Sequence, residues 1–237
     1  MTSRAMVRRL VVVACALLST LLVTSCAQRV TNRPYWYSRA HPNPPPAAGT
    51  HVIQGTVGIS QLRGFDTTGG AGNEVRDRSL PMLGGAFQRA FRDGPIQIGI
   101  EGGFTFGFDR DRTTVSTGGG AIVVRRDDDV FLLDGFVGAY FNIPMRQGWR
   151  LYAGIGPVLQ YADVEVEVDD FTAVTRISDN GFGGGYYARA GAELEIGGAA
   201  LLGLGVRWLD STADLGGALG NLDVQGAQYG LTLSQAF

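Results

Sequence analysis

The chain has 237 residues, of which 45% are apolar, 18% are charged and 36 are glycine, a composition too apolar for a disordered chain. Its 20 basic residues are all arginine and face 22 acidic residues, and a net charge of −2 without a clustered basic face argues against a nucleic-acid-binding protein. A mean hydropathy of +0.07 argues against a helical membrane protein but leaves a membrane β-barrel open, because alternating polar and apolar residues cancel in an average.

The N-terminal segment is predicted to be a secretory signal peptide. Arg4, Arg8 and Arg9 precede an apolar run over residues 10–23, and small residues follow that run. This order of charged, apolar and small segments is typical of a signal peptide. The run is too short for a membrane-spanning helix, which needs about 20 residues.

The residues Val23-Thr24-Ser25-Cys26 resemble the lipobox of bacterial lipoproteins. The resemblance implies that the signal peptide over residues 1–25 is removed and that Cys26 becomes the lipidated first residue. An ordinary cut after Ala27 is the alternative, because the residues around it also fit a small-x-small cleavage site.

Residues 26–50 are predicted to form an extended tether. This stretch contains more than half of the nine prolines of the chain and shows no periodicity. Proline favours the semi-rigid polyproline II conformation, so we expect a spacer rather than a folded unit.

From His51 onward the hydrophobicity alternates with a period of two, which predicts half-buried β-strands. In the clearest segment, Ile98 and Ile100 share one face, whereas Gln97 and Glu101 share the other. Eight such segments are predicted over residues 52–61, 80–91, 96–108, 130–143, 149–161, 182–196, 199–209 and 225–237.

The predicted connections alternate between short and long. Short turns are expected at residues 92–95, 144–148 and 197–198, whereas each of the other four connections spans about 15 to 20 residues. Short turns at one end and long loops at the other are typical of outer-membrane barrels, whose turns are periplasmic and whose loops are extracellular. An even number of strands places the tether and Cys26 on the periplasmic side.

Aromatic residues cluster near both ends of the predicted strands. The periplasmic group contains Phe91, Phe141, Trp149 and Phe237, and the outer group contains Phe108, Phe131, Tyr161 and Trp208. Two such belts are typical of the two interfaces of a membrane.

The terminal segment ends in phenylalanine after alternating apolar residues, namely Tyr229, Leu231, Leu233 and Phe237. Together with the eight alternating segments, it resembles the small eight-stranded outer-membrane proteins of the OmpA-barrel, OmpX and opacity-protein porin family. The resemblance implies an all-β, antiparallel up-and-down transmembrane β-barrel over residues 51–237. It also implies a monomer in outer-membrane lipid that the barrel-assembly machinery inserts through the terminal strand.

A soluble lipocalin-like barrel, with its apolar residues inside, is the rival architecture. The interior of an eight-stranded barrel is just wide enough for side chains to fill. The face rich in glycine and charge suits that interior, whereas Phe104, Phe106 and Phe108 on the other face suit lipid. The membrane barrel is therefore favoured.

Seven charged residues on the face predicted to point inward form a candidate lumen network. They are Glu101, Asp134, Arg150, Arg189, Glu193, Glu195 and Arg207. Buried ions must pair, because desolvating one alone costs several kcal/mol. If the turn at 197–198 is tight, Arg189 and Arg207 lie opposite each other and need acids between them, for which Glu101, Asp134 and Glu193 are the candidates. The network is either a gate in a narrow pore or, as we favour, a plug that closes the barrel.

No catalytic residue, metal site or cofactor is predicted. Hydrolases among small barrels imply a histidine near the outer rim, but His41 lies in the tether and His51 begins the first strand at the periplasmic end. The acidic clusters at 127–129 and 165–170 lack the spacing of an EF-hand, so a solvated acidic face is the default. The run over residues 163–169 alternates and is expected to continue the fifth strand beyond the membrane. An apolar stretch at 121–124, after a hairpin tip at 118–120, is a candidate edge for strand addition.

The sequence therefore predicts a non-enzymatic outer-membrane β-barrel protein that stabilises the envelope or interacts at the surface. Its lumen is closed by charged side chains, and an extracellular ligand would contact its loops. A small passive channel for ions or small solutes is the alternative. No nucleic-acid partner is expected.

Overall fold

The computed structural model describes residues 51–67, 78–91, 95–117, 122–145, 148–169, 174–197, 200–217 and 219–237. The predicted signal peptide, the candidate lipidation site Cys26, the tether over 26–50 and the hairpin tip at 118–120 lie outside these ranges. No helix among the described residues is long and apolar enough to cross a membrane.

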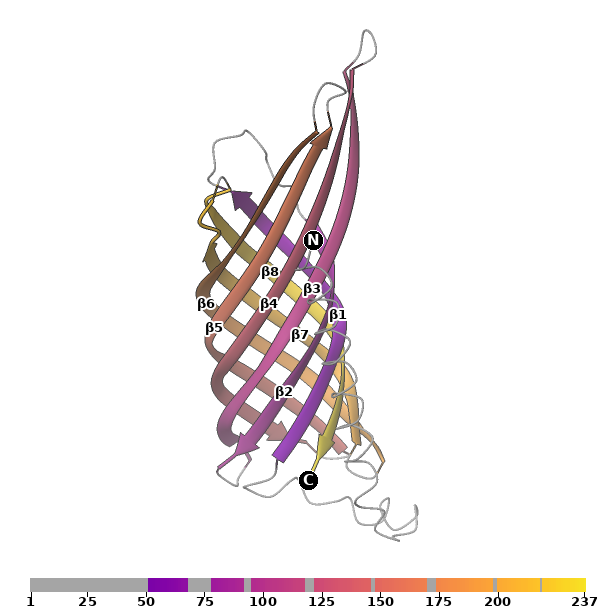
Figure 1. Ribbon diagram of the computed structural model, residues 1–237. Coiled ribbons are helices and arrows are strands. Elements are labelled where there is room, and N and C mark those ends of the chain that lie inside the picture. Colours follow the sequence, from indigo (N-terminus) through magenta and orange to yellow (C-terminus); the bar gives the residue numbers. More distant parts are fainter. Residues whose placement is uncertain are drawn as a thin grey trace.

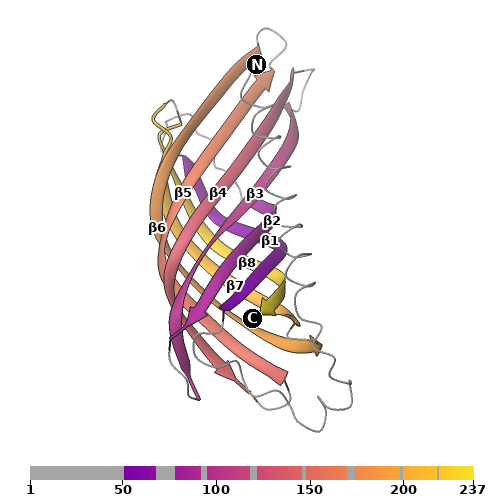
Figure 2. The same ribbon diagram turned by 60° about the horizontal axis from the view of Figure 1, so that its bottom comes forward.

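Eight antiparallel strands close into a barrel in which each strand pairs with the next one in the chain and β8 pairs with β1 (Figures 1 and 2). The strands are β1 (His51–Thr67), β2 (Arg78–Ala90), β3 (Gln97–Thr117), β4 (Ile122–Pro144), β5 (Trp149–Asp169), β6 (Val174–Gly197), β7 (Ala200–Asp214) and β8 (Asn221–Ala236). His51 and Phe237 complete the closure, because the backbone N–H of each donates to the carbonyl of the other at 3.0 and 2.9 Å. The predicted all-β, eight-stranded up-and-down architecture is confirmed.

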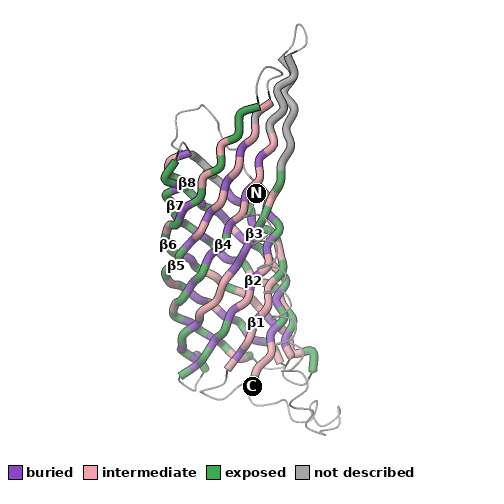
Figure 3. Tube along the Cα trace, viewed as in Figure 1, coloured by how far each residue is buried: buried purple, intermediate pink, exposed green. Residues whose placement is uncertain are grey.

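Alternation along each strand separates two faces of the barrel wall (Figure 3). In β8, for example, Gln228 and Thr232 are buried, whereas Tyr229 and Leu231 are exposed. Bulky apolar side chains are exposed around the whole wall, among them Val57, Ile59, Ile98, Ile100, Val137, Ile155, Leu159, Leu204 and Val206. This arrangement is the opposite of a lipocalin-like barrel.

The outward phenylalanines of β3 differ in exposure. Phe108 is 58% exposed, but Phe106, which lies on the same face by alternation, is only 8% exposed. Of the two predicted aromatic belts, the members at the end with the short turns are exposed. At the opposite end Phe108 and Trp208 are exposed, whereas Phe131 and Tyr161 are half-buried. We call these two ends of the barrel the turn end and the loop end.

Most strands extend further at the loop end than predicted, whereas the continuation of β5 over 163–169 was expected. β3 and β4 are separated only by residues 118–121, β5 and β6 only by residues 170–173, and β7 and β8 only by residues 215–220. The expectation of long loops at these three connections is wrong, and the acidic cluster at 127–129 lies within β4 rather than in a loop. Continued strand pairing satisfies the backbone hydrogen bonds that a loop would leave to water.

Parts of β3, β4, β5 and β6 rise beyond the rest of the barrel (Figure 1). We define this protruding sheet as residues 108–117, 122–131, 163–169 and 174–180. The β2–β3 ladder ends at the pair Met82–Gly107, and the β6–β7 ladder ends at Phe182–Asp214. Within the described pairing, the β3 and β6 parts of the protruding sheet are therefore its two free edges.

An acidic pair on the central strands of the protruding sheet contacts one arginine on each edge strand. Asp129 of β4 is directly opposite Glu165 of β5. Arg110 of β3 contacts Asp129 at 3.2 Å, and Arg176 of β6 contacts Glu165 at 2.6 Å. Like charges opposite each other destabilise a sheet, so the flanking arginines offset this repulsion. The described residues contain no group of three or more His, Cys, Asp or Glu arranged to hold a metal ion.

Candidate functional site

Three buried ion pairs fill the part of the lumen nearer the turn end, and each joins two strands. The pairs are Arg150 of β5 with Glu193 of β6, Arg189 of β6 with Glu101 of β3, and Arg207 of β7 with Asp134 of β4. Three guanidinium groups face three carboxylates, so this network carries no net charge.

The Arg150–Glu193 pair is the most deeply buried. The Arg150 guanidinium donates to Glu193 Oε2 from Nη2 at 2.5 Å and from Nε at 2.6 Å. The other carboxylate oxygen, Oε1, accepts hydrogen bonds from Gln54 Nε2 at 2.7 Å and from the Ser234 hydroxyl at 2.8 Å. Both oxygens of a fully buried carboxylate are thus satisfied by charged or polar donors.

The Arg189–Glu101 pair crosses the lumen from β6 to β3. Arg189 Nε donates to Glu101 Oε1 at 2.9 Å, while its Nη2 contacts Oε2. The Tyr187 hydroxyl donates to the same Oε1 at 2.8 Å. Arg189 Nη1 also donates to Gln54 Oε1 at 2.8 Å, and because Gln54 donates to Glu193, it connects the first two pairs.

The Arg207–Asp134 pair is bidentate. Arg207 Nη2 donates to Asp134 Oδ1 at 2.8 Å and Nη1 donates to Oδ2 at 3.1 Å. Nη1 also donates to Gln228 Oε1 at 3.0 Å, and the Thr105 hydroxyl donates to Asp134. Arg189 and Arg207 are direct partners across β6 and β7, so the acids on β3 and β4 separate two like charges.

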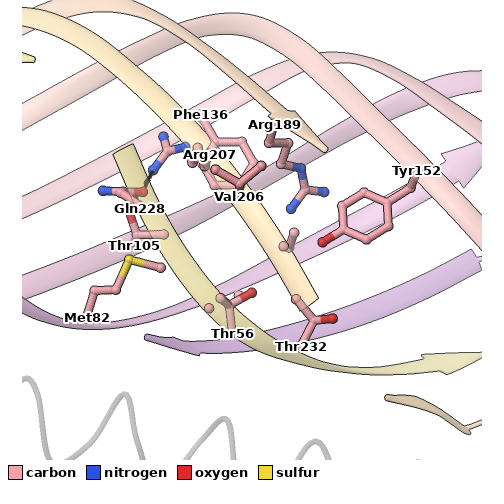
Figure 4. Close-up of a pocket in the computed structure, with 14 residues that line it drawn as sticks. Thr56, Met82, Thr105, Phe136, Tyr152, Arg189, Val206, Arg207, Gln228 and Thr232 are labelled. Atoms are coloured by element: carbon pink, nitrogen blue, oxygen red, sulfur yellow. Dashed lines mark hydrogen bonds between the residues drawn. The ribbon is translucent and has the colours of Figure 1, made fainter. Parts of the chain in front are cut away.

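Aromatic rings lie between the guanidinium groups (Figure 4). The Phe136 ring centroid is 4.7 Å from Cζ of Arg207 and 5.5 Å from Cζ of Arg189. Tyr152 lies on the far side of Arg189, at 5.3 Å from its Cζ. Attraction between a desolvated guanidinium and a ring face contributes about 2 kcal/mol, so the rings stabilise the charges as well as filling space.

Glycines on the inner face make room for these large side chains. A Cβ atom added at Gly154 of β5 would overlap the Glu101 carboxylate. At Gly138 of β4, it would lie 2.5 Å from the Tyr187 hydroxyl oxygen. The glycine-rich face of the sequence is therefore the space that the ion pairs occupy.

We predict that Gly154→Ala destabilises the barrel by about 1–3 kcal/mol, because the added methyl group displaces Glu101 from its contact with Arg189. Urea-induced unfolding of the refolded protein, followed by tryptophan fluorescence, measures the loss. Gly135→Ala on the outer face of β4 is the matched control, since a Cβ there meets no atom within 4 Å. Equal losses in the two variants would contradict the prediction.

The other sequence-predicted site residues lie apart from the three pairs. Glu195 is half-buried near the end of β6 and forms no ion pair or side-chain hydrogen bond with a described residue. The residues of the predicted assembly signal lie on the outer face of β8 or directly after it, namely Tyr229, Leu231, Leu233 and Phe237.

The lumen changes character toward the loop end, where it is apolar. Buried residues from several strands form one cluster there, including Leu62, Leu80, Leu132, Ala162, Leu209, Ala213, Leu222 and Val224. Leu215 and Leu219, which follow β7, pack into the same cluster, and the backbone N–H of Leu219 donates to the Asp179 carboxylate at 3.0 Å.

The expectation of a polar, glycine-lined interior along the whole barrel is therefore wrong for this half. Inner and outer faces are both apolar here, as at Leu209 beside Trp208, so alternation of polarity gives a weak signal. Consecutive apolar residues such as those at 130–133 of β4, which occupy both faces of the strand, were the available clue.

His51, the one histidine among the described residues, lies at the turn end. Its ring is 5.4 Å from the Phe87 ring and 5.7 Å from the Phe237 ring, measured between centroids. The lumen network, by contrast, consists of mutually neutralised charges with their hydrogen bonds directed at one another.

No family model matches the chain, and no curated protein matches it. Among solved structures, the attachment invasion locus protein Ail of Yersinia pestis is similar over 80% of this chain and 99% of its own, with 14% identity and a TM-score of 0.46. OprG, an outer membrane protein of Pseudomonas aeruginosa, is similar over 81% and 97%, with 15% identity and a TM-score of 0.45. The protease OmpT of Escherichia coli is similar over 80% and 97%, with 7% identity and a TM-score of 0.46. The likeness to these outer-membrane barrels concerns the fold alone.

Proposed function

We propose that the protein is a non-enzymatic outer-membrane β-barrel with a closed lumen, which stabilises the envelope or presents the protruding sheet to the surroundings. The observation that carries this proposal is the filling of the lumen. Three ion pairs occupy the part nearer the turn end, and an apolar cluster fills the part nearer the loop end.

The outer wall supports the location in a lipid bilayer. Large apolar side chains are exposed on every strand of the barrel. Soluble monomers rarely expose contiguous apolar patches larger than a few hundred Å². In our proposal the turn end faces the periplasm, because β1 begins and β8 ends there. The tether over residues 26–50 and a lipid on Cys26 then lie on the periplasmic side, and the barrel-assembly machinery recognises the terminal strand.

The protruding sheet is the element proposed to meet an extracellular ligand. Its free edges on β3 and β6 offer backbone groups to an added strand. The arginines on those edges, Arg110 and Arg176, restrict accidental pairing. The contact was expected on long loops and on an apolar edge at 121–124, of which residues 122–124 lie in β4 and pair with β3.

We predict that the purified barrel, reconstituted in planar lipid bilayers, shows no steady channel openings. An ion that enters the lumen meets a dry apolar cluster, where desolvation costs several kcal/mol or more. A known porin in the same membrane is the positive control. Steady openings that change in Glu101→Gln or Arg189→Gln would instead establish the alternative, a small passive channel.

A further inference from the structure

Five buried polar atoms of the lumen have no hydrogen-bond partner among the described residues. One is Asn142 Oδ1 near the turn end, and the other four are Arg207 Nε, Thr232 Oγ1, Ser60 Oγ and Gln160 Nε2. Buried polar groups in native proteins are almost always satisfied, either by the protein or by an ordered water molecule.

Two cavities lie among these residues, and each is lined by two of the last four. The first has a volume of about 30 Å³ and is lined by Arg207 and Thr232, together with Thr56 and Tyr152 (Figure 4). The second has a volume of about 10 Å³, and Ser60 and Gln160 line it. In both cavities, two of the lining residues therefore carry a buried polar atom without a partner.

Size and charge define the occupant. A water molecule needs about 10–15 Å³ of such volume, so the first cavity has room for about two waters and the second for about one. The two ion pairs that reach the cavities through Arg189, Arg207 and Asp134 already balance, and an added ion would remain uncompensated. We propose that both cavities are ordered water sites and that these waters complete the hydrogen bonding of the lumen network.

Met82 is the apolar residue among the three that the two cavities share. Met82, Thr105 and Gln228 line both cavities, and Figure 4 places the three together at one end of the first. Met82 is 7% exposed, and its thioether offers a water molecule only a weak acceptor. We therefore place the break between the two water sites at Met82. Beyond the second cavity, Leu62, Leu80 and Leu209 belong to the apolar cluster. The hydrated positions thus end inside the barrel, which refines the proposed closed lumen and rests on it.

Nuclear Overhauser effects between water and methyl groups test the proposal in the full-length refolded chain, with Met, Thr, Leu and Val methyls labelled. We expect cross-peaks from water to Met82 and Thr232 with the sign of long-lived contacts. Leu222 and Val224, which are fully buried in the apolar cluster, are expected to show none. The proposal is overturned if the Met82 and Thr232 methyls are resolved but show no cross-peak to water. It is also overturned if these methyls show cross-peaks to detergent chains instead.

Two variants assign the sites separately. Thr232→Val is expected to abolish the water cross-peak of the Thr56 methyl, which lines only the first cavity. Ser60→Ala is the matched control, because it alters only the second cavity and should leave Thr56 unchanged. A Thr56 cross-peak that survives Thr232→Val at full strength overturns the role of Thr232. If the barrel conducts ions and the water cross-peaks are present, the closed lumen is rejected but the water sites are not. If the barrel does not conduct and the cross-peaks are missing, the water sites are rejected but the closed lumen is not.

Discussion

An Arg150→Leu substitution is expected to destabilise the barrel by about 3–5 kcal/mol, the usual loss when one partner of a buried ion pair is removed. The variant leaves the Glu193 carboxylate fully buried without the guanidinium that contacts it at 2.5 Å. Gln54 and Ser234 still donate to Glu193, but neither carries a charge. The remaining carboxylate must therefore take up a proton or stay uncompensated.

Urea-induced unfolding in lipid vesicles and the heat-modifiable migration of the folded barrel on gels measure this loss. Arg89→Leu is the matched control, because Arg89 is exposed on the outer wall beside Phe91 and lies outside the lumen network. The double variant Arg150→Leu/Glu193→Leu should recover most of the stability, since a buried pair replaced by apolar residues is often neutral. A single variant that loses no more than the control would contradict the structural role of the network.

Leu204→Arg is expected to cost about 2–4 kcal/mol if the outer wall lies in lipid. Leu204 is 66% exposed and lies on β7 midway between its start at Ala200 and the aromatic Trp208 near the loop end. In a bilayer this position is far from both interfaces, so the guanidinium would enter hydrocarbon. In a water-soluble protein, replacing an exposed leucine changes stability by only about 0.5 kcal/mol.

The same unfolding measurement in vesicles distinguishes the two environments. Ser178→Arg is the matched control, because Ser178 is exposed on the protruding sheet and is expected to lie in water. A large loss for Leu204→Arg with a small loss for Ser178→Arg is the expected outcome. Small losses for both variants would show that the outer wall does not face lipid.

The alternation of polar and apolar residues along the chain was sufficient to predict most of the fold. Ile98 and Ile100 against Gln97 and Glu101 already assign the two faces of β3, because successive side chains of a strand point to opposite sides. The same reasoning predicted eight strands and their short turns. The ends of β3 and β4 were not predictable in this way, because charged residues such as Asp128 are compatible with either a loop or a solvated strand.

The partners within the lumen depend on closure. Glu101 and Arg189 are 88 residues apart in the chain and meet only because β3 and β6 face each other across the closed barrel. Glu101, Asp134 and Glu193 were the acids expected between Arg189 and Arg207, but the sequence pattern did not assign a partner to each arginine. The two water cavities and the dividing position of Met82 follow from packing in the same closed space.

The sequence by itself determined the period of two, the number of strands and the face of each residue, because these are properties of neighbouring residues in one strand. Only the tertiary structure decided which charges pair, that the lumen is apolar toward the loop end, and that β3 to β6 continue as a protruding sheet. The reason is that the stagger between strands, fixed only when β8 pairs with β1, sets the height of each inward side chain in the barrel.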